Sequence, residues 1–312
     1  MKRPLAFGGP VTTTPAILSL RRIISLATLL MAVLWLSACS AVKLSYNALP
    51  EVSYWWADAY GDFNGEQSLR LKQDLADLQA WHRTRELPRY RELLLNLERL
   101  TSTEPDAAQL CSLLPPARER LQALAEQSAP MIARLALSLS PAQLDHMDKK
   151  FAKNEAKLRS EWVELSPGEL LDKRIEQYTD RAESLYGRLN AAQRQGLREA
   201  LQASAFDPRI RLAEQQRRHQ DMLGTLRRLR SSGAPQTQAQ TQAQAEQAWL
   251  AYLARALSPP VPAHREQQEH SIEEGCQIYA QLQRQATPEQ RDKAAKRLRG
   301  WASDVQALSQ QR

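Results

Sequence analysis

Glycine, β-branched runs and aromatic residues are scarce in this sequence of 312 residues. It contains 11 Gly and 4 Phe, and aromatic residues make up 6% of the chain. β-Sandwiches and doubly wound sheets need Val and Ile runs punctuated by Gly, so the sequence argues against both folds. Ala, Leu, Gln, Arg and Glu are abundant instead, a mixture that favours helices. We therefore expect an all-α fold, an elongated bundle of several helices.

The motifs of common catalytic and metal sites are also missing. The five His residues are scattered, without H-E-x-x-H or a His/Cys cluster at zinc-ligand spacing. The sequence has no G-x-S-x-G, no P-loop and no G-x-G-x-x-G. We therefore predict no catalytic residue, no metal site and no small-molecule cofactor.

Residues 1–38 have the pattern of a secretory signal peptide. Arg21 and Arg22 precede Ile23–Leu36, an apolar run of 14 residues, whereas a membrane span needs roughly 20 residues. The sequence L-S-A-C at residues 36–39 resembles the lipobox of bacterial lipoprotein signals. That resemblance implies cleavage before Cys39, a diacylglycerol on its thiol and an N-acyl chain on its new amino terminus.

A chain anchored at Cys39 would face the periplasm. Ser40, not Asp, follows the cysteine, so the resemblance implies the inner leaflet of the outer membrane, with the inner membrane as the alternative. An ordinary secretory signal with an incidental Cys39 and an uncleaved signal anchor are the other interpretations. Loss of four basic residues and no acidic one would lower the formal charge from +7 to +3, so we expect no nucleic-acid partner.

Two cysteines remain for a disulfide, Cys111 and Cys276. The periplasm permits disulfides, and this one would link the C-terminal helices covalently to the N-terminal ones. Both residues also lie on apolar helical stripes, where free buried thiols are common. A bridge and two free thiols are both consistent with the sequence.

Apolar periodicity and composition divide the chain after the signal into segments. Residues 39–65 combine the lipidated cysteine, a short tether over 40–50 and an aromatic segment. Residues 66–230 carry apolar stripes at spacings of three and four, which predict the main helical bundle. Residues 231–245 are rich in Gln and of low complexity, and predict a flexible connection. Residues 246–312 predict C-terminal helices that pack back on the bundle.

Two segments are candidate interaction surfaces. In the first, two carboxylates four residues apart share a helix face, which would suit a cation, a general acid/base pair or a helix cap. The aromatic residues around them fit the core, a membrane interface or a partner-docking patch. The second is an Arg-rich helix that would bind phosphates or an acidic partner, or form a solvated face. The candidates are Tyr54, Trp55, Trp56, Asp58, Tyr60, Asp62 and Phe63, and Arg217, Arg218, Arg227 and Arg228.

Three short segments share a helix-start pattern. Residues 139–143 (LSPAQ), 189–193 (LNAAQ) and 286–290 (ATPEQ) each place a capping residue three positions before Gln. A capping box explains this spacing on its own, because the two side chains satisfy each other's backbone N–H groups. The segments also resemble the LTxxQ motif of periplasmic Spy/CpxP-type proteins, which implies a chaperone or stress-sensor role.

A longer resemblance runs over residues 36–100. Its signature is Cys39, Y-N at 46–47, Y-W-W at 54–56, D-x-Y-x-D-F at 58–63, Gln67, W-H-R at 81–83, and E-L-P at 86–88 with Tyr90. This pattern is similar to a family of uncharacterised proteobacterial lipoproteins. The resemblance implies an all-helical periplasmic domain and no established activity.

The sequence therefore predicts a membrane-anchored periplasmic lipoprotein that is not an enzyme. Its expected role is a protein-interaction or scaffolding module of the cell envelope, with another envelope protein as partner. One alternative is a Spy-like chaperone or envelope-stress sensor. The other is an enzyme that acts on envelope lipid or peptidoglycan through Asp58 and Asp62.

Overall fold

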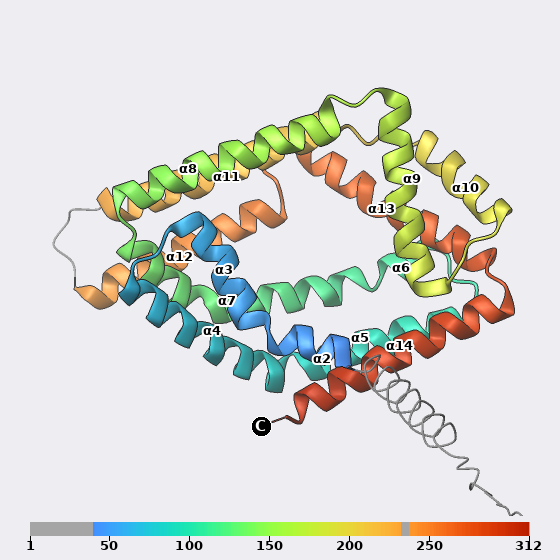
Figure 1. Ribbon diagram of the computed structural model, residues 1–312, viewed down its shortest axis with the longest axis horizontal. Coiled ribbons are helices and arrows are strands. Elements are labelled where there is room, and N and C mark those ends of the chain that lie inside the picture. The colour runs from blue at the N-terminus through green and yellow to red at the C-terminus, as the bar shows by residue number, and fades with distance from the viewer. Residues whose placement is uncertain (1–39, 232–236, 312) are drawn as a thin grey trace, which may run out of the picture. The chain divides into compact units, whose positions relative to one another are not determined.

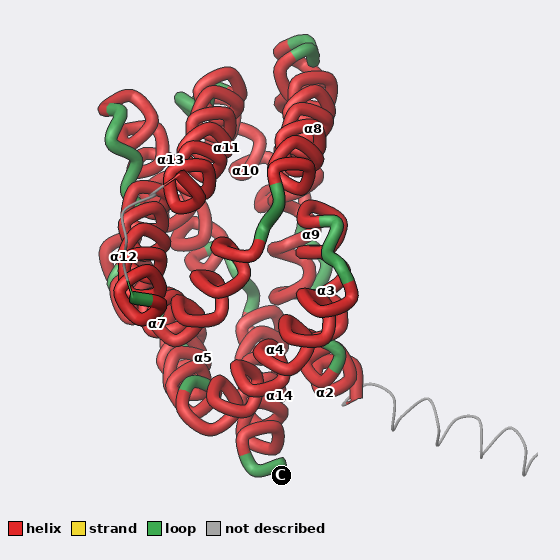
Figure 2. The backbone as a smooth tube through the Cα atoms, turned by 90° about the vertical axis from the view of Figure 1, so that its left-hand side faces the viewer, coloured by secondary structure: helices red, strands yellow, loops and turns green. Residues whose placement is uncertain are grey.

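The computed structural model describes residues 40–231 and 237–311, which form helices joined by short loops (Figure 1; Figure 2). The helices are α2 (Ser40–Asn47), α3 (Leu49–Gly61), α4 (Gly65–Arg85), α5 (Leu87–Thr101), α6 (Ala107–Cys111), α7 (Leu114–Ser138), α8 (Pro141–Leu158), the π-helix η1 (Arg159–Val163), α9 (Pro167–Tyr186), α10 (Ala191–Gln202), α11 (Pro208–Ser231), α12 (Gln238–Leu257), α13 (Pro262–Arg284) and α14 (Pro288–Ser309). No strand occurs in these ranges, so the predicted all-α fold is confirmed. None of the described helices is both long and apolar enough to span a bilayer.

The chain divides into two units, Met1–Ser45 and Tyr46–Arg312. Of the first unit the structure describes only residues 40–45, which lie in α2. The predicted signal peptide and Cys39 lie outside the described residues. The second unit contains every other helix and the candidate surfaces.

Helices replace the tether that the sequence predicts over residues 40–50. α2 ends at Asn47, and α3 begins at Leu49 with Pro50 in its first turn. Proline is tolerated there because the first-turn N–H groups have no partner within the helix. Tyr46 is buried, and its hydroxyl lies 3.0 Å from Nδ1 of His82. The prediction of a tether is therefore wrong for this stretch.

α12 begins at Gln238, inside the segment 231–245 that the sequence predicts to be flexible. Ala245 is fully buried, and the Gln242 side chain donates a hydrogen bond to the carbonyl of Pro130 in α7 (3.0 Å). Ala and Gln are good helix formers, so low complexity does not prevent a helix here. The prediction is wrong for residues 238–245, and residues 232–236 lie outside the described ranges.

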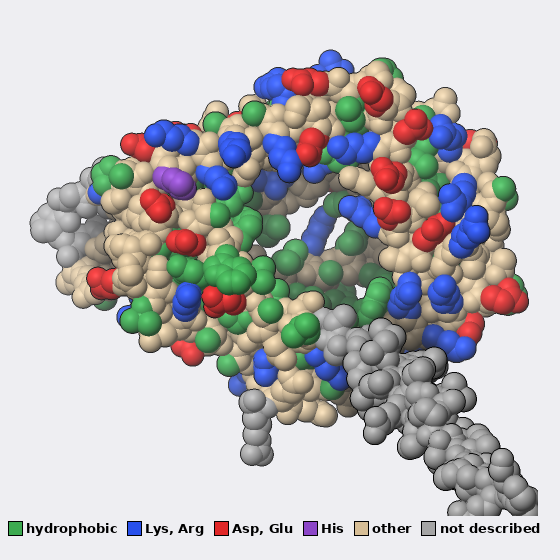
Figure 3. Space-filling view, in the orientation of Figure 1, with side chains coloured by type: hydrophobic (Ala, Val, Ile, Leu, Met, Phe, Trp, Pro, Cys, Tyr) green, Lys and Arg blue, Asp and Glu red, His purple; other side chains and the backbone are tan. Residues whose placement is uncertain are grey.

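Apolar side chains of the Tyr46–Arg312 unit gather in separate clusters. One joins α9, α10, α13 and α14 around Tyr186, Leu197 and Ile278. Another joins α7, α8 and α11 around Leu144 and Leu226. α14 also lies along α5, so the C-terminal helices pack back on the preceding ones. The face in Figure 3 is hollowed at its centre, which agrees with clusters distributed around the unit.

The starts of α4 and α8 are joined through the glutamines of their capping boxes. Gln143 donates to Oε1 of Gln67 (2.8 Å) and to the carbonyl of Asp62 (2.9 Å). Gln67 in turn donates to the carbonyl of Ser138 (3.0 Å). Both side chains are buried, so the pair satisfies polar groups that would otherwise destabilise the packing.

The starts of α10 and α14 repeat this arrangement. Gln193 donates to Oε1 of Gln290 (2.8 Å) and to the carbonyl of Gln285 (3.2 Å). Gln290 donates to the carbonyl of Arg188 (3.0 Å). In both pairs each glutamine reaches the carbonyl two residues before the partner helix's capping residue. The fold therefore uses the same helix-to-helix joint twice.

Candidate functional site

α3 presents apolar side chains to the outside. Trp55 and Trp56 are 61% and 67% exposed, and Leu49 and Val52 are 46% and 51% exposed. Residues 49, 52 and 56 follow one another at spacings of three and four, so they lie along one side of the helix. Hydrophobic side chains also gather over α3 in the space-filling view (Figure 3). We call these four residues the α3 face.

The aromatic side chains of Tyr54, Tyr60 and Phe63 point into the fold. The Tyr54 hydroxyl donates to Ser68 Oγ (3.0 Å) in α4. Tyr60 packs on Phe151 of α8, with 5.5 Å between ring centroids. Phe63 packs against the cluster of α7, α8 and α11. Tyr54, Tyr60 and Phe63 therefore hold α3 in place, while Trp55 and Trp56 do not.

Asp58 and Asp62 terminate α3. Asp58 Oδ1 accepts a hydrogen bond from the backbone N–H of Phe63 (2.9 Å). Asp62 has a left-handed backbone (φ 44°), which Asp tolerates better than most residues, and its carbonyl accepts the Gln143 bond. These contacts fit the helix-capping interpretation of the two residues.

The arginines predicted as a phosphate-binding surface have partners within the chain. Arg217 and Arg218 are hydrogen-bonded to Glu214, and Arg217 also lies 3.5 Å from Asp221. Arg227 pairs with Asp148 of α8 (3.2 Å), and Arg228 donates to Thr225 Oγ1 (3.0 Å). The arrangement favours a structural role for these side chains over an open phosphate site. They lie in α11, away from the α3 face in sequence.

His82, His219 and His264 lie beside carboxylates or aromatic rings. His264 Nδ1 is 2.8 Å from Glu214, and the His219 ring stacks on Phe151 at 4.0 Å. Burial lowers the pKa of His82, and the nearby Glu86 opposes this shift. Within residues 40–231 and 237–311, no group of three or more His, Cys, Asp or Glu could hold a metal ion.

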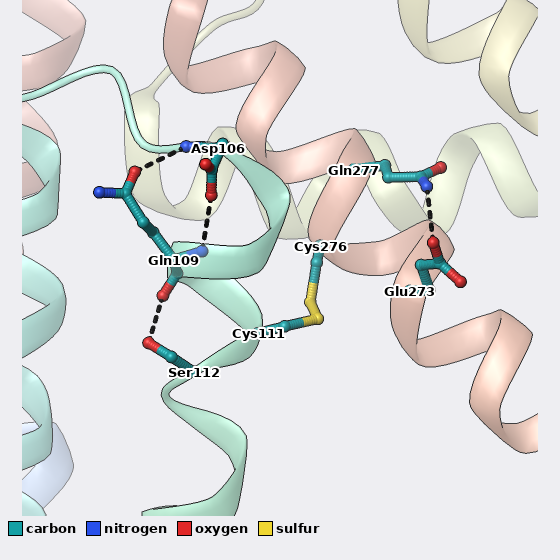
Figure 4. Close-up of a disulfide and its surroundings, with 7 residues drawn as sticks. All are labelled: Asp106, Gln109, Cys111, Ser112, Glu273, Cys276 and Gln277. Atoms are coloured by element: carbon teal, nitrogen blue, oxygen red, sulfur yellow. Dashed lines mark hydrogen bonds between the residues drawn. A yellow bond between two sulfur atoms is a disulfide. The ribbon is translucent and has the colours of Figure 1, made fainter.

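A disulfide joins Cys111 and Cys276, with 5.7 Å between their Cα atoms (Figure 4). Cys111 is the last residue of α6, a helix that starts at the capping box of Asp106 and Gln109. Gln109 N–H donates to Asp106 Oδ1 (2.7 Å), as Figure 4 shows. Of the two alternatives that the sequence left open, the structure has the bridge, and it ties α6 to α13.

An apolar pocket of about 570 Å³ adjoins the disulfide, and we call it the disulfide pocket. Its walls come from α5, α6, the start of α7, α9, α13 and α14, with Leu100, Leu110, Leu185, Ile272, Leu298 and Trp301 among the lining residues. Tyr178, Arg181 and Tyr279 add polar groups to the lining. Sequence reasoning missed this pocket because apolar stripes predict burial without saying which helices leave a gap.

Residues 59–253 match the model of a family of unknown function (DUF6279). The chain belongs to this family. Its match begins in α3 and ends in α12, so it includes Cys111 and excludes Cys276. Neither a curated protein nor a solved structure is significantly similar to the chain. The expected membership of an uncharacterised family is thus supported, whereas the family match adds no statement about a lipid anchor or an activity.

Proposed function

We propose that this chain is a lipid-anchored envelope protein that binds another envelope protein through the α3 face and catalyses no reaction. The lipobox-like residues 36–39 support acylation of Cys39, and several acyl chains make a stable anchor. Ser40 supports the inner leaflet of the outer membrane, facing the periplasm. The observation that carries the interaction is the exposure of Trp55 and Trp56.

Large apolar side chains that stay exposed after folding are candidates for partner contact. Trp is enriched among the residues that contribute most to protein–protein binding. Leu49 lies ten positions after Cys39, a length of chain that covers at most about 35 Å. With an acylated Cys39, the α3 face would therefore stay near the membrane, and its partner must be reachable there.

The charges of α3 favour a protein partner over the bilayer surface. Helices that lie on anionic membranes carry Lys and Arg on their polar side. α3 contains no Lys or Arg, and its acidic residues are Glu51 and Asp58. An apolar groove on a folded envelope protein fits this helix better than a layer of anionic headgroups.

The alternative functions receive less support. An enzyme would need Asp58 free to act, yet its carboxylate is bonded to the Phe63 backbone at the end of α3. The segments that resemble LTxxQ supply glutamines to the two helix joints, which accounts for them without an unfolded client.

Crosslinking in intact cells tests this function. The lipidated chain, its Trp55→Ala/Trp56→Ala variant and a Leu121→Ala/Leu257→Ala variant are crosslinked and captured. The control pair is also apolar, is 48% and 44% exposed, and lies on α7 and α12. A Cys39→Ala chain tests whether the complex needs the anchor. Any captured protein is then purified and titrated against each variant.

One envelope protein, captured at constant ratio by the wild type and the control, is the expected result. The Trp variant should bind it at least about thirtyfold more weakly, since hot-spot residues contribute about 2 kcal/mol or more. A broad set of unfolded proteins, captured equally by all variants, would instead identify a chaperone. Trp-dependent binding to protein-free anionic vesicles would replace the protein partner with the bilayer.

A further inference from the structure

Tyr186, Gln283 and Thr101 form a part of the disulfide pocket's wall whose polar atoms are paired within the chain. The Tyr186 hydroxyl donates to Gln283 Oε1 (2.9 Å), and Gln283 Nε2 donates to the carbonyls of Thr101 (2.8 Å) and Thr103 (3.1 Å). Tyr186 and Gln283 are both buried. A ligand therefore gains little from hydrogen bonds at this wall, whereas an apolar chain gains from leaving water.

Arg181 is the one charged residue that lines the pocket. Its side chain is exposed on α9 and forms no ion pair or hydrogen bond with the residues that the structure describes. Burial raises the pKa of Tyr279, and the Arg181 charge opposes this shift, as it does at Tyr178. An uncompensated guanidinium beside two phenol groups is suited to a carboxylate or phosphate, which it can bind with two parallel hydrogen bonds.

Gly275 leaves part of the wall open. It lines the pocket from within α13, and a Cβ added there would meet no atom within 4 Å. The same holds for Gly300 within α14, which does not line the pocket. A large side chain at 275 would therefore fill space that a ligand needs, and the same change at 300 would not.

We infer that the disulfide pocket binds a single-chain amphiphile with an anionic head group. The alkyl chain lies against the leucines, Ile272 and Trp301, and the head group binds Arg181. The pocket volume of about 570 Å³ lies within the roughly 300–1,000 Å³ of small-molecule sites. This site is separate from the α3 face and does not depend on partner binding there.

Photolabelling tests the site in the lipidated full chain, reconstituted in discs of uncharged phosphatidylcholine. The probes are photoreactive forms of palmitate, of lysophosphatidylglycerol and, as an uncharged control, of hexadecanol. Labelled peptides are identified by mass spectrometry. Gly275→Phe, and the smaller Gly275→Leu, are compared with Gly300→Phe, while Arg181→Gln is compared with Arg188→Gln, which changes an exposed arginine outside the pocket. Circular dichroism checks that each variant folds.

Labelling of α9, α13 and α14 by an anionic probe is the expected result. Palmitate alone would indicate free fatty acid as the source, and lysophosphatidylglycerol alone would indicate a phospholipid product. Gly275→Phe should reduce labelling at least about tenfold, because burial of the alkyl chain supplies most of the binding. Arg181→Gln should reduce it about tenfold, as for loss of a charge-assisted hydrogen bond.

Three outcomes would overturn the inference. Labelling could fall on other helices, or persist unchanged in a folded Gly275 variant. Equal labelling by hexadecanol would remove the role of the anionic head group. None of these outcomes bears on the crosslinking result at the α3 face, because Trp55 and Trp56 do not line the pocket.

Discussion

Glu214 binds three basic side chains at once. Its carboxylate accepts hydrogen bonds from Arg217 (2.8 Å) and Arg218 (2.8 Å), and lies 2.8 Å from His264 Nδ1. Burial by itself raises the pKa of Glu214, but the hydrogen bonds from these three residues outweigh it and lower the pKa to about 2. The carboxylate therefore stays ionised in the folded chain where an ordinary Glu is protonated.

Replacing this carboxylate should destabilise the chain in a pH-dependent way. Because the folded pKa of Glu214 is below the ordinary 4.5, its ionised form stabilises the fold above about pH 4.5. That contribution is lost as the pH falls toward 2. We expect Glu214→Gln to lower the free energy of unfolding by about 2 kcal/mol at pH 7, as for charge-assisted hydrogen bonds. Thermal unfolding followed by circular dichroism should show the two melting temperatures converging at low pH.

Glu176 provides the matched control for that measurement. It is exposed on α9 and forms no ion pair with the described part of the chain. Glu176→Gln should change the melting temperature little. If Glu214→Gln melts below the wild type by the same number of degrees at pH 7 and at pH 3, the role assigned to Glu214 is contradicted.

The sequence predicts only part of the Glu214 cluster. Arg217 and Arg218 lie three and four residues after Glu214, a spacing that places them beside it on a helix. His264 is 50 residues away and reaches Glu214 only because α13 packs on α11. The local sequence therefore left a phosphate-binding face open, since it does not show that Asp148 of α8 and His264 of α13 pack against α11.

At the scale of elements, helix starts follow from the sequence and the contacts between them do not. The predicted capping boxes at residues 140–143, 190–193 and 287–290 are confirmed. The structure adds others, which start at Asn64, Asp106, Ser166 and Thr237. A capping box is a local pattern of four residues, so the sequence contains all of it. The paired glutamines are 76 and 97 residues apart, and no local pattern specifies which helix starts meet.

Gln193 should contribute more to the free energy of unfolding than a glutamine that forms hydrogen bonds only within its own capping box. It is 1% exposed, and its loss removes one bond of the Gln290 side chain and the bond that the Gln285 carbonyl accepts. We expect Gln193→Ala to lower the free energy of unfolding by about 2–3 kcal/mol, because a buried unsatisfied group adds to the lost cap. Gln240 accepts from Thr237 N–H, so Gln240→Ala should cost about 1 kcal/mol or less.

Urea unfolding of the two variants measures this difference. Equal losses of unfolding free energy in the two variants would mean that the bonds of Gln193 to Gln285 and Gln290 contribute no stability beyond its own capping box. A double-mutant cycle with Gln290→Ala then isolates the pair, and its coupling energy should be about 1 kcal/mol.

At the scale of the whole molecule, composition predicts the fold class and long-range packing decides the rest. Abundant Ala, Leu and Gln suffice to predict helices, and they form even in the low-complexity stretch from Gln238. The disulfide pocket needs helices from residues 87 to 309 to converge, which apolar periodicity cannot specify. For the same reason the sequence is consistent with both a bridge and free thiols. The bridge forms only if α6 packs against α13, which is a long-range contact.

The disulfide is the one covalent link between distant parts of the described chain, and it closes a separation of 165 residues. Constraint of the unfolded chain by such a loop is worth about 5 kcal/mol in the chain-entropy model. α6, Ala107–Cys111, has only 5 residues, too few for a helix to be stable by itself. Its position against α13 therefore depends on the bond and on packing.

Replacing both cysteines, as Cys111→Ala/Cys276→Ala, should lower the melting temperature and loosen α6 before the rest of the unit. Hydrogen exchange should show protection falling first over residues 107–111 and in the adjoining part of α13. Reductant should lower the melting temperature of the wild type toward that of the variant and leave the variant unchanged. If the variant keeps both its melting temperature and the protection of α6, packing alone holds this helix, and the wall of the disulfide pocket does not need the bond.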